Sequence, residues 1–266
     1  MTQSSRHLEV YLQKCKEMLG NFASSASEET IAKYIQLLQD PIQKAILPKG
    51  VVGILDVHRL AFRYIVNTEF AVGITTEQFL EKGVEAYFES MVKEPLNLDA
   101  IPVFMGFLIE SIGAVPPALR DGFLAYIYGI QNIRPSGVNF TTLVQVKGLA
   151  FDEDGMPTLC LFILEDIAHL TKKAVKPRMR ISFADNRQVA NLSMDDKVIK
   201  KGDIFSDREL EVLKRLLKGN ESKEIADKLF ISPNTVDNHR KNMIRKIDAR
   251  DTTALVHLSK MLGVLH

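Results

Sequence analysis

The sequence predicts an α+β protein in which an antiparallel sheet with flanking helices precedes an all-α domain of four helices. The sheet is indicated by strand-length apolar runs within residues 51–66 and 123–192, with helical periodicity between them. The all-α domain is indicated by helix start and stop signals that follow one another closely after residue 205. We expect a helical segment, a sheet domain, a linker and a four-helix domain, over residues 1–48, 49–192, 193–204 and 205–266.

The composition is that of a folded protein, with 46% hydrophobic and 25% charged residues among 266. It excludes a disordered tail, a collagen-like fibre and a disulfide scaffold. The net charge of +1 is unevenly placed, because residues 201–266 carry 13 basic and 10 acidic side chains. The nearly neutral total therefore conceals a small basic module at the C-terminal end.

Neither a leader peptide nor a membrane span is predicted. The most apolar stretch, Ala100–Leu119, contains Glu110 and Pro102, which would make a spanning helix costly. The two cysteines, Cys15 and Cys160, lie far apart and have no metal-ligand spacing to another Cys or His, so we expect reduced thiols. These observations predict a cytoplasmic protein with no membrane contact.

Two amphipathic helices are expected in the N-terminal segment. Apolar residues keep helical spacing over residues 8–22 and again over residues 31–42. Neither helix can bury its apolar face alone. The sequence leaves open whether the two helices pack on the following domain or on a second copy of the chain.

The sheet domain is expected to open with a hairpin formed by residues 51–57 and 61–66. Two helices and then five further strands are expected over Thr76–Met91 and Leu98–Ile112, and over Phe123–Ile133, Phe140–Phe151, Thr158–Asp166, Met179–Phe183 and Gln188–Leu192. The Asp154-Gly155 pair predicts a tight hairpin turn between two of these strands.

The order of these elements and three phrases, at residues 52–67, 70–80 and 152–167, resemble a PAS-type sensor domain. The first phrase corresponds to an opening hairpin, the second to the helical segment after it, and the third to a closing hairpin that ends in acidic residues. The resemblance implies a five-stranded antiparallel sheet, a pocket and frequent dimerisation. It leaves open whether an unidentified small molecule or an interaction partner occupies that pocket.

No cofactor is expected in the sheet domain. Cys160 lies in a predicted strand, whereas a flavin photosensor of this fold needs a reactive cysteine in a helix. His58 lies at a turn and His169 just after a strand, so neither is placed as a haem ligand. Six residues either line a cavity or simply fill the core, and the sequence favours the core: Phe104, Met105, Phe107, Tyr126, Tyr128 and Phe162.

No catalytic or metal-binding motif occurs in the sequence, which lacks a Walker loop, a His-Glu-x-x-His helix, a nucleophile elbow and a Cys-x-x-Cys pair. We therefore expect no catalytic residue, no metal and no enzymatic activity. A run with five basic and no acidic residues, Thr171–Arg180, precedes the C-terminal domain. A solvated surface is the default interpretation of this run, and a supplementary phosphate contact is the alternative.

Three helix signatures follow one another in the C-terminal domain. Ser206 and Glu209 have capping-box spacing ahead of the first helix, and a short second helix covers residues 223–229. Ser232 caps the third helix, over Asn234–Ile247. Two helices joined by a short turn, the second of them rich in basic residues, predict a helix-turn-helix.

The third helix carries a polar stripe at helical spacing, while Val236, Met243 and Ile247 are its inward positions. Such a stripe matches base edges in the major groove, because Asn pairs with adenine, Lys and Arg with guanine, and Asp with cytosine. The predicted base contacts are Asn234, Asp237, Asn238, Lys241 and Arg245. The predicted phosphate contacts are Thr235, His239, Arg240, Asn242 and Lys246.

Residues 205–213, 219–229 and 232–247 closely resemble the successive helices of a LuxR-type (GerE-type) DNA-binding domain. The resemblance implies double-stranded DNA as a partner and a homodimer formed through the fourth helix. The apolar stripe of that helix is Leu255, Leu258, Met261 and Leu262. Three residues depart from the family pattern, where a lysine, a glycine and an arginine are common: Asp237, Asp248 and Thr252.

Two interpretations of Asp237 stay open, namely acceptance of a bond from cytosine and an i, i+4 pair that holds Lys241. Two other classes of protein are weighed against a regulator. A sigma-factor-like protein is disfavoured by a fourth amphipathic helix over Ala249–Leu265, and an enzyme with an accessory DNA module is disfavoured by the missing catalytic motifs. The sequence thus predicts a sequence-specific DNA-binding transcriptional regulator, with RNA polymerase as an open further partner.

Overall fold

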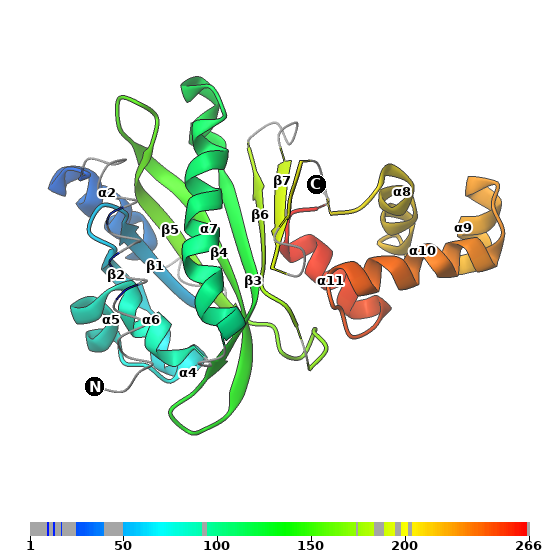
Figure 1. Ribbon diagram of the computed structural model, residues 1–266, viewed down its shortest axis with the longest axis horizontal. Coiled ribbons are helices and arrows are strands. Elements are labelled where there is room, and N and C mark those ends of the chain that lie inside the picture. Colours follow the sequence, from blue (N-terminus) through cyan, green and yellow to red (C-terminus); the bar gives the residue numbers. More distant parts are fainter. Residues whose placement is uncertain are drawn as a thin grey trace. The chain divides into compact units, whose positions relative to one another are not determined.

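The computed structural model describes residues 10, 13, 17, 25–39, 50–91, 95–173, 175–183, 189–194, 198–201 and 204–264 (Figure 1). The chain forms two compact units. Unit 1 comprises residues 1–166 and 176–200, and unit 2 comprises residues 167–175 and 201–266. Of the helix expected over residues 8–22, the structure describes residues 10, 13 and 17, and Cys15 lies outside the described residues.

Unit 1 is built on one sheet in the order β2-β1-β5-β4-β3-β6-β7-β8 (Figure 1). Its strands are β1 (Val51–Asp56), β2 (Ala61–Val66), β3 (Leu124–Ile133), β4 (Asn139–Phe151), β5 (Pro157–Asp166), β6 (Arg178–Ser182), β7 (Val189–Ser193) and β8 (Val198–Lys201). The pairings from β2 through to β7 are antiparallel. The α+β prediction is confirmed, and three strands extend the sheet beyond the five implied by the PAS resemblance.

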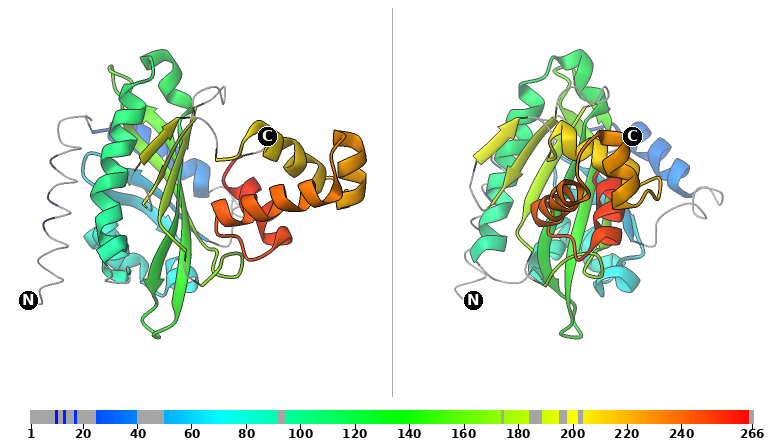
Figure 2. Two further views of the ribbon diagram at one scale, coloured as in Figure 1. Left: turned by 45° about the vertical axis from the view of Figure 1, so that its right-hand side comes forward. Right: turned by 90° about the vertical axis from the view of Figure 1, so that its right-hand side faces the viewer.

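Helices cover both faces of this sheet. Among the described residues of unit 1, the helices are α2 (Glu28–Gln39), α4 (Thr68–Val72), α5 (Thr76–Lys82), α6 (Val84–Ser90) and α7 (Pro95–Gly113), with a 3-10 turn over Pro117–Gly122. Side chains alternate along β1, so Leu55 belongs to the main core and Ile54 to a smaller cluster with Ile31 of α2. The helices α7 and α2 therefore lie on opposite sides of the sheet (Figure 2).

The single helix expected over Thr76–Met91 is wrong, because Gly83 divides it into α5 and α6. Gly83 has φ +62°, and a Cβ there would lie 2.2 Å from the carbonyl oxygen of Leu60. The amide of Val84 donates to that same carbonyl at 3.1 Å. The close approach of α6 to the β1–β2 turn needs a residue without a side chain, and helical periodicity does not report such a contact.

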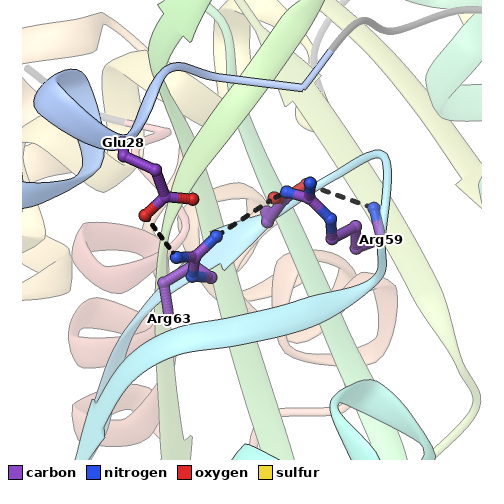
Figure 3. A network of polar contacts seen from close by, with 4 residues as sticks. Glu28, Arg59 and Arg63 are labelled. Carbon is purple, nitrogen blue, oxygen red and sulfur yellow. Dashed lines mark hydrogen bonds and ion pairs between the residues drawn. The ribbon is translucent and has the colours of Figure 1, made fainter.

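The helix α2 packs on its own chain, which answers the open question for the second N-terminal helix. Arg63 of β2 binds Glu28 at 2.6 Å (Figure 3). Arg59 donates to Asp56 from its guanidinium at 2.7 Å and from its backbone at 3.1 Å. Because Asp56 is fully buried, these donors compensate a carboxylate withdrawn from water.

The described part of unit 2 contains four helices, α8 (Asp207–Leu216), α9 (Ser222–Leu229), α10 (Pro233–Lys246) and α11 (Thr252–Met261). The predicted capping box is confirmed, since Ser206 accepts from the amide of Glu209 and Glu209 accepts from the amide of Ser206. Ser232 accepts from the amide of Thr235 and begins α10, as expected. The core of the four helices includes Val212, Leu213, Ile225, Val236 and Met243.

The division of the chain differs from the expected domains at two places. Part of the expected linker, over residues 193–204, is the strand β8, and residues up to 200 belong to unit 1. Residues 167–175 belong to unit 2, although they precede it in sequence. The second difference comes from pairing between distant segments, because Thr171 bridges to Ala249, and local composition does not indicate such a contact. Within the described part of the chain, no helix is long and apolar enough to cross a membrane.

Candidate nucleic-acid interface

The turn between α9 and α10 has the geometry of a helix-turn-helix. Phe230 ends α9 in the left-handed region, with φ 54°, and its amide donates to the carbonyl of Asp227. Arg208 of α8 donates from its guanidinium to the carbonyl of Leu229 at 2.6 Å, so the end of α9 is held by the first helix. The helix α10 packs against α8, α9 and α11, which together fix its orientation.

The helix α10 presents the predicted stripe to solvent. Val236, Met243 and the following Ile247 are fully buried, which fixes the rotation of the helix about its axis. The opposite side exposes four of the five predicted base contacts, namely Asn234, Asn238, Lys241 and Arg245. Amide and cationic groups at this spacing are suited to the edges of successive bases in a major groove.

Asp237, the fifth predicted base contact, is half-buried and bound within unit 2. Its carboxylate accepts from the hydroxyl of Ser222 at 2.8 Å and pairs with the guanidinium of Arg240 at 2.9 Å. Arg240 also donates to the Ser222 hydroxyl at 3.4 Å. The internal partner is Arg240 at i, i+3, not the Lys241 expected at i, i+4, so the network joins the start of α9 to the middle of α10.

Lys246, a predicted phosphate contact, donates to the carboxylate of Glu209 at 2.6 Å. Burial by itself would raise the pKa of Glu209, but hydrogen bonds from Lys246 and Ser206 outweigh it and hold the pKa below its ordinary value. Lys246 therefore ties the end of α10 to the start of α8. Its contact with phosphate stays a prediction.

The other predicted phosphate contacts lie on the flanks of the stripe and are half-buried: Thr235, His239, Arg240 and Asn242. The hydroxyl of Thr235 is 2.8 Å from that of Ser232, at the cap of the helix. The amide oxygen of Asn242 accepts from Arg245 at 2.9 Å, which orients one of the exposed cations of the stripe. These contacts position the stripe and are compatible with a flanking role beside it.

The apolar stripe expected to face a partner on the fourth helix is not exposed. Leu255, Leu258 and Leu262 have no accessible surface, and Met261 is half-buried. Apolar spacing identifies one face of a helix but does not tell whether a partner or the chain itself covers it. The exposed residues of α11 are polar ones, among them Thr253, His257 and Lys260.

Unit 1 contains an apolar cavity of about 150 Å³ between the sheet and its covering helices. Phe104, Met105 and Phe162, three of the six candidates, line it. Phe107 is buried in the main core, and Tyr126 and Tyr128 lie on the strand positions that alternate with the cavity-lining Ile127.

The polar atoms at the cavity wall carry no charge. The hydroxyl of Tyr87 lies 2.8 Å from that of Thr142. Burial raises the pKa of the Cys160 thiol to about 12, so that thiol is neutral. His58 and His169 are exposed and do not line the cavity. Among the described residues, no group of three or more His, Cys, Asp or Glu is placed to hold a metal ion.

Comparison with known proteins identifies the C-terminal part. Residues 203–259 match the family of bacterial regulatory proteins described as the luxR family. The C-terminal part of unit 2 is a LuxR-family helix-turn-helix domain. The domain resembles the oxygen regulatory protein NreC of Staphylococcus epidermidis, with 35% identity over 29% of this chain and 37% of NreC. It also resembles the transcriptional regulatory protein LnrK of Bacillus subtilis, with 46% identity over 23% of this chain and 27% of LnrK.

Similar solved structures include a VqmA–ligand–DNA complex from Vibrio cholerae, with 17% identity and a TM-score of 0.29 over 86% of this chain and 85% of that chain. Another is SdiA of Escherichia coli, with 16% identity and a TM-score of 0.27 over 98% of this chain and 99% of that chain. At these TM-scores the superpositions do not identify corresponding residues, so no residue role is transferred from either structure.

Proposed function

We propose that this chain is a sequence-specific DNA-binding transcriptional regulator, not an enzyme, and that it acts in the cytoplasm as a homodimer. The observation that supports this proposal is the exposed amide and cationic stripe of α10, carried by a capped helix inside a LuxR-family domain. A dimer would place two such helices on paired half-sites of an operator.

The stripe provides complementary groups for direct readout. Asn234 and Asn238 present paired donors and acceptors for adenine, while Lys241 and Arg245 donate to O6 and N7 of guanine. The flanking Thr235 and His239 are placed for phosphates, which orient the protein without reading sequence. The ion pair of Asp237 with Arg240 keeps that guanidinium beside the stripe.

Binding-site selection from random duplex DNA tests this proposal. The full chain should enrich one motif, and Lys241→Ala should relax the preference at one base pair by about 1–3 kcal/mol. The exposed Lys260 of α11 lies off the stripe, so Lys260→Ala is the matched control and should return the wild-type motif. Failure to enrich any motif, or an unchanged motif for Lys241→Ala, would contradict the proposal.

We further propose that the cavity of unit 1 is the sensing site and that its ligand is small, uncharged and apolar. The neutral wall offers no counter-ion to a charged ligand. A cavity of about 150 Å³ with Leu, Ile and Phe walls stays dry and accepts benzene or xenon in another protein. Ligand binding would then shift the population of DNA-binding states.

Benzene and xenon are suitable probes for this cavity. At ten times its dissociation constant, a ligand should stabilise the protein by about 1.4 kcal/mol, measured by chemical unfolding of unit 1. Cys160→Phe should fill the cavity and abolish this stabilisation, whereas Met105→Ala should enlarge the cavity and keep it. If neither probe stabilises the wild-type chain, the cavity is not a ligand site.

A further inference from the structure

We propose that the segment between β5 and β6, Ile167–Val175, is a second DNA-contacting element in which Lys172 and Lys173 bind backbone phosphates beside the bases read by α10. The inference rests on the proposed function, since it requires α10 to lie in the major groove. It favours, for Lys172 and Lys173, the phosphate contact that the sequence left as the alternative to a solvated surface.

Backbone pairing attaches this segment to the turn that follows α10. Thr171 forms an antiparallel bridge with Ala249. The amide of Lys172 donates to the carbonyl of Asp248 at 2.9 Å, and the amide of Arg250 donates to the carbonyl of Leu170 at 2.9 Å. Two hydrogen bonds across one bridge fix the register of the segment against residues 248–250.

Burial separates the anchoring side chains from the basic ones. Ile167, Leu170, Thr171 and Val175 are all less than a tenth exposed. Lys172 and Lys173 are exposed. The backbone beneath the two lysines is therefore ordered before DNA arrives, which lowers the entropy cost of a phosphate contact compared with a flexible basic tail.

The position of the bridge suits a contact with the DNA backbone. Asp248 lies two residues after the end of α10, and Arg245 is the last residue of the exposed stripe. A helix of 14 residues is about 21 Å long. The major groove is about 12 Å wide, so the end of such a helix reaches the phosphates that border the groove.

Lys172 and Lys173 place two exposed cationic side chains in a segment that is bridged to the turn after α10. At this end of the helix, Lys246 pairs with Glu209 and Arg250 pairs with Asp251. The segment from Thr171 to Arg180 contains five basic and no acidic residues. Phosphate is the chemistry that exposed lysine side chains attract, and release of the counterions of DNA supplies the free energy.

Salt dependence of DNA binding tests the inference. In the full chain carrying Lys172→Gln and Lys173→Gln, the slope of log K against log salt should fall by about 1.8, because each phosphate contact contributes about 0.9. The loss of affinity between about 50 and 200 mM salt should then be about tenfold smaller than for the wild type. The base motif obtained by selection should not change, because phosphates carry no sequence information.

Two control proteins separate a phosphate contact from a general effect of charge. Lys33→Gln with Lys260→Gln removes two charges from exposed positions elsewhere and should keep the wild-type slope. The variant that carries Lys172→Arg and Lys173→Arg should have the wild-type slope, since arginine also binds phosphate.

An unchanged slope in the double glutamine variant, or an equal fall in the control pair, would overturn the inference and leave the proposed function intact. A changed base motif would also overturn it, because the segment would then act in readout. If the wild-type chain selected no motif at all, the proposed function itself would fail first.

Discussion

Glu209→Gln should destabilise unit 2, because Glu209 joins the beginning of α8 to the end of α10. Its side chain is only 6% exposed, and it accepts hydrogen bonds from Lys246 at 2.6 Å and from the amide of Ser206 at 2.8 Å. Glutamine keeps an acceptor for Ser206 but loses the charged bond to Lys246. Such a bond contributes about 1.5–3 kcal/mol. Since Lys246 is 41% exposed, its ammonium regains water in the variant, and we expect a loss of about 1–2 kcal/mol.

The same contact predicts a pH dependence with a definite sign. The pKa of Glu209 is lower in the folded chain than its ordinary value of 4.5. The unfolded chain therefore binds more protons in that range, and the stabilisation is present above pH 4.5 and is lost as the pH falls through the folded-state pKa. Glu209→Gln should remove this part of the acid sensitivity.

Urea unfolding of the full chain, followed through the transition of unit 2 at neutral and acidic pH, measures both effects. Glu211→Gln is the matched control, because Glu211 is 53% exposed and pairs with Arg208 within the same helix. It should cost less than about 0.5 kcal/mol. Equal stabilities for Glu209→Gln and the wild type, or an unchanged acid sensitivity, would refute the role given to this contact.

Three further predictions follow from single contacts. Asp237→Asn should strengthen non-specific DNA binding by removing a negative charge, yet return the wild-type motif in binding-site selection, because the carboxylate contacts Ser222 and Arg240; a relaxed base pair would favour direct readout of cytosine instead. Gly83→Ala should destabilise unit 1 by about 1–3 kcal/mol in urea unfolding, since the new Cβ would meet a carbonyl at 2.2 Å in a left-handed conformation, and a stability equal to that of the wild type would contradict this. Leu258→Asp should unfold the four-helix part, seen as lost helical circular dichroism, because the side chain is fully buried; a folded variant with weaker pairing would instead indicate a dimer contact.

Helix ends in the C-terminal part were predictable because their signals are local. The capping pair Ser206 and Glu209 and the cap Ser232 each act within three residues, and all three are found where the spacing predicts them. The apolar runs of β1 and β2 were equally informative, because two strand-length runs separated by a short turn predict a hairpin. The rotation of α10 follows from Val236 and Met243, which must face the core.

Features that depend on distant segments were not predictable from these patterns. Gly83 interrupts a helix because Leu60 lies against it, and the sequence around Gly83 does not report that neighbour. The buried stripe of α11 has the same spacing as a partner-facing stripe, so periodicity cannot separate the two cases. The carboxylate of Asp237 accepts a hydrogen bond from Ser222 on another helix, whereas the spacing along α10 predicted Lys241 as its partner.

Asp248 departs from the LuxR-type pattern at a position whose backbone contacts the segment between β5 and β6. Glycine is common there in LuxR-type domains, and the backbone of Asp248 has φ 52°, in the left-handed region that glycine adopts without strain. Aspartate occupies this region at a cost below the roughly 1–2 kcal/mol of most residues. Its carbonyl accepts the amide of Lys172, and this net gain of about 0.5–1.5 kcal/mol offsets the strain. The turn is therefore stabilised by the segment between β5 and β6, and this contact offsets the strain of a residue other than glycine at position 248.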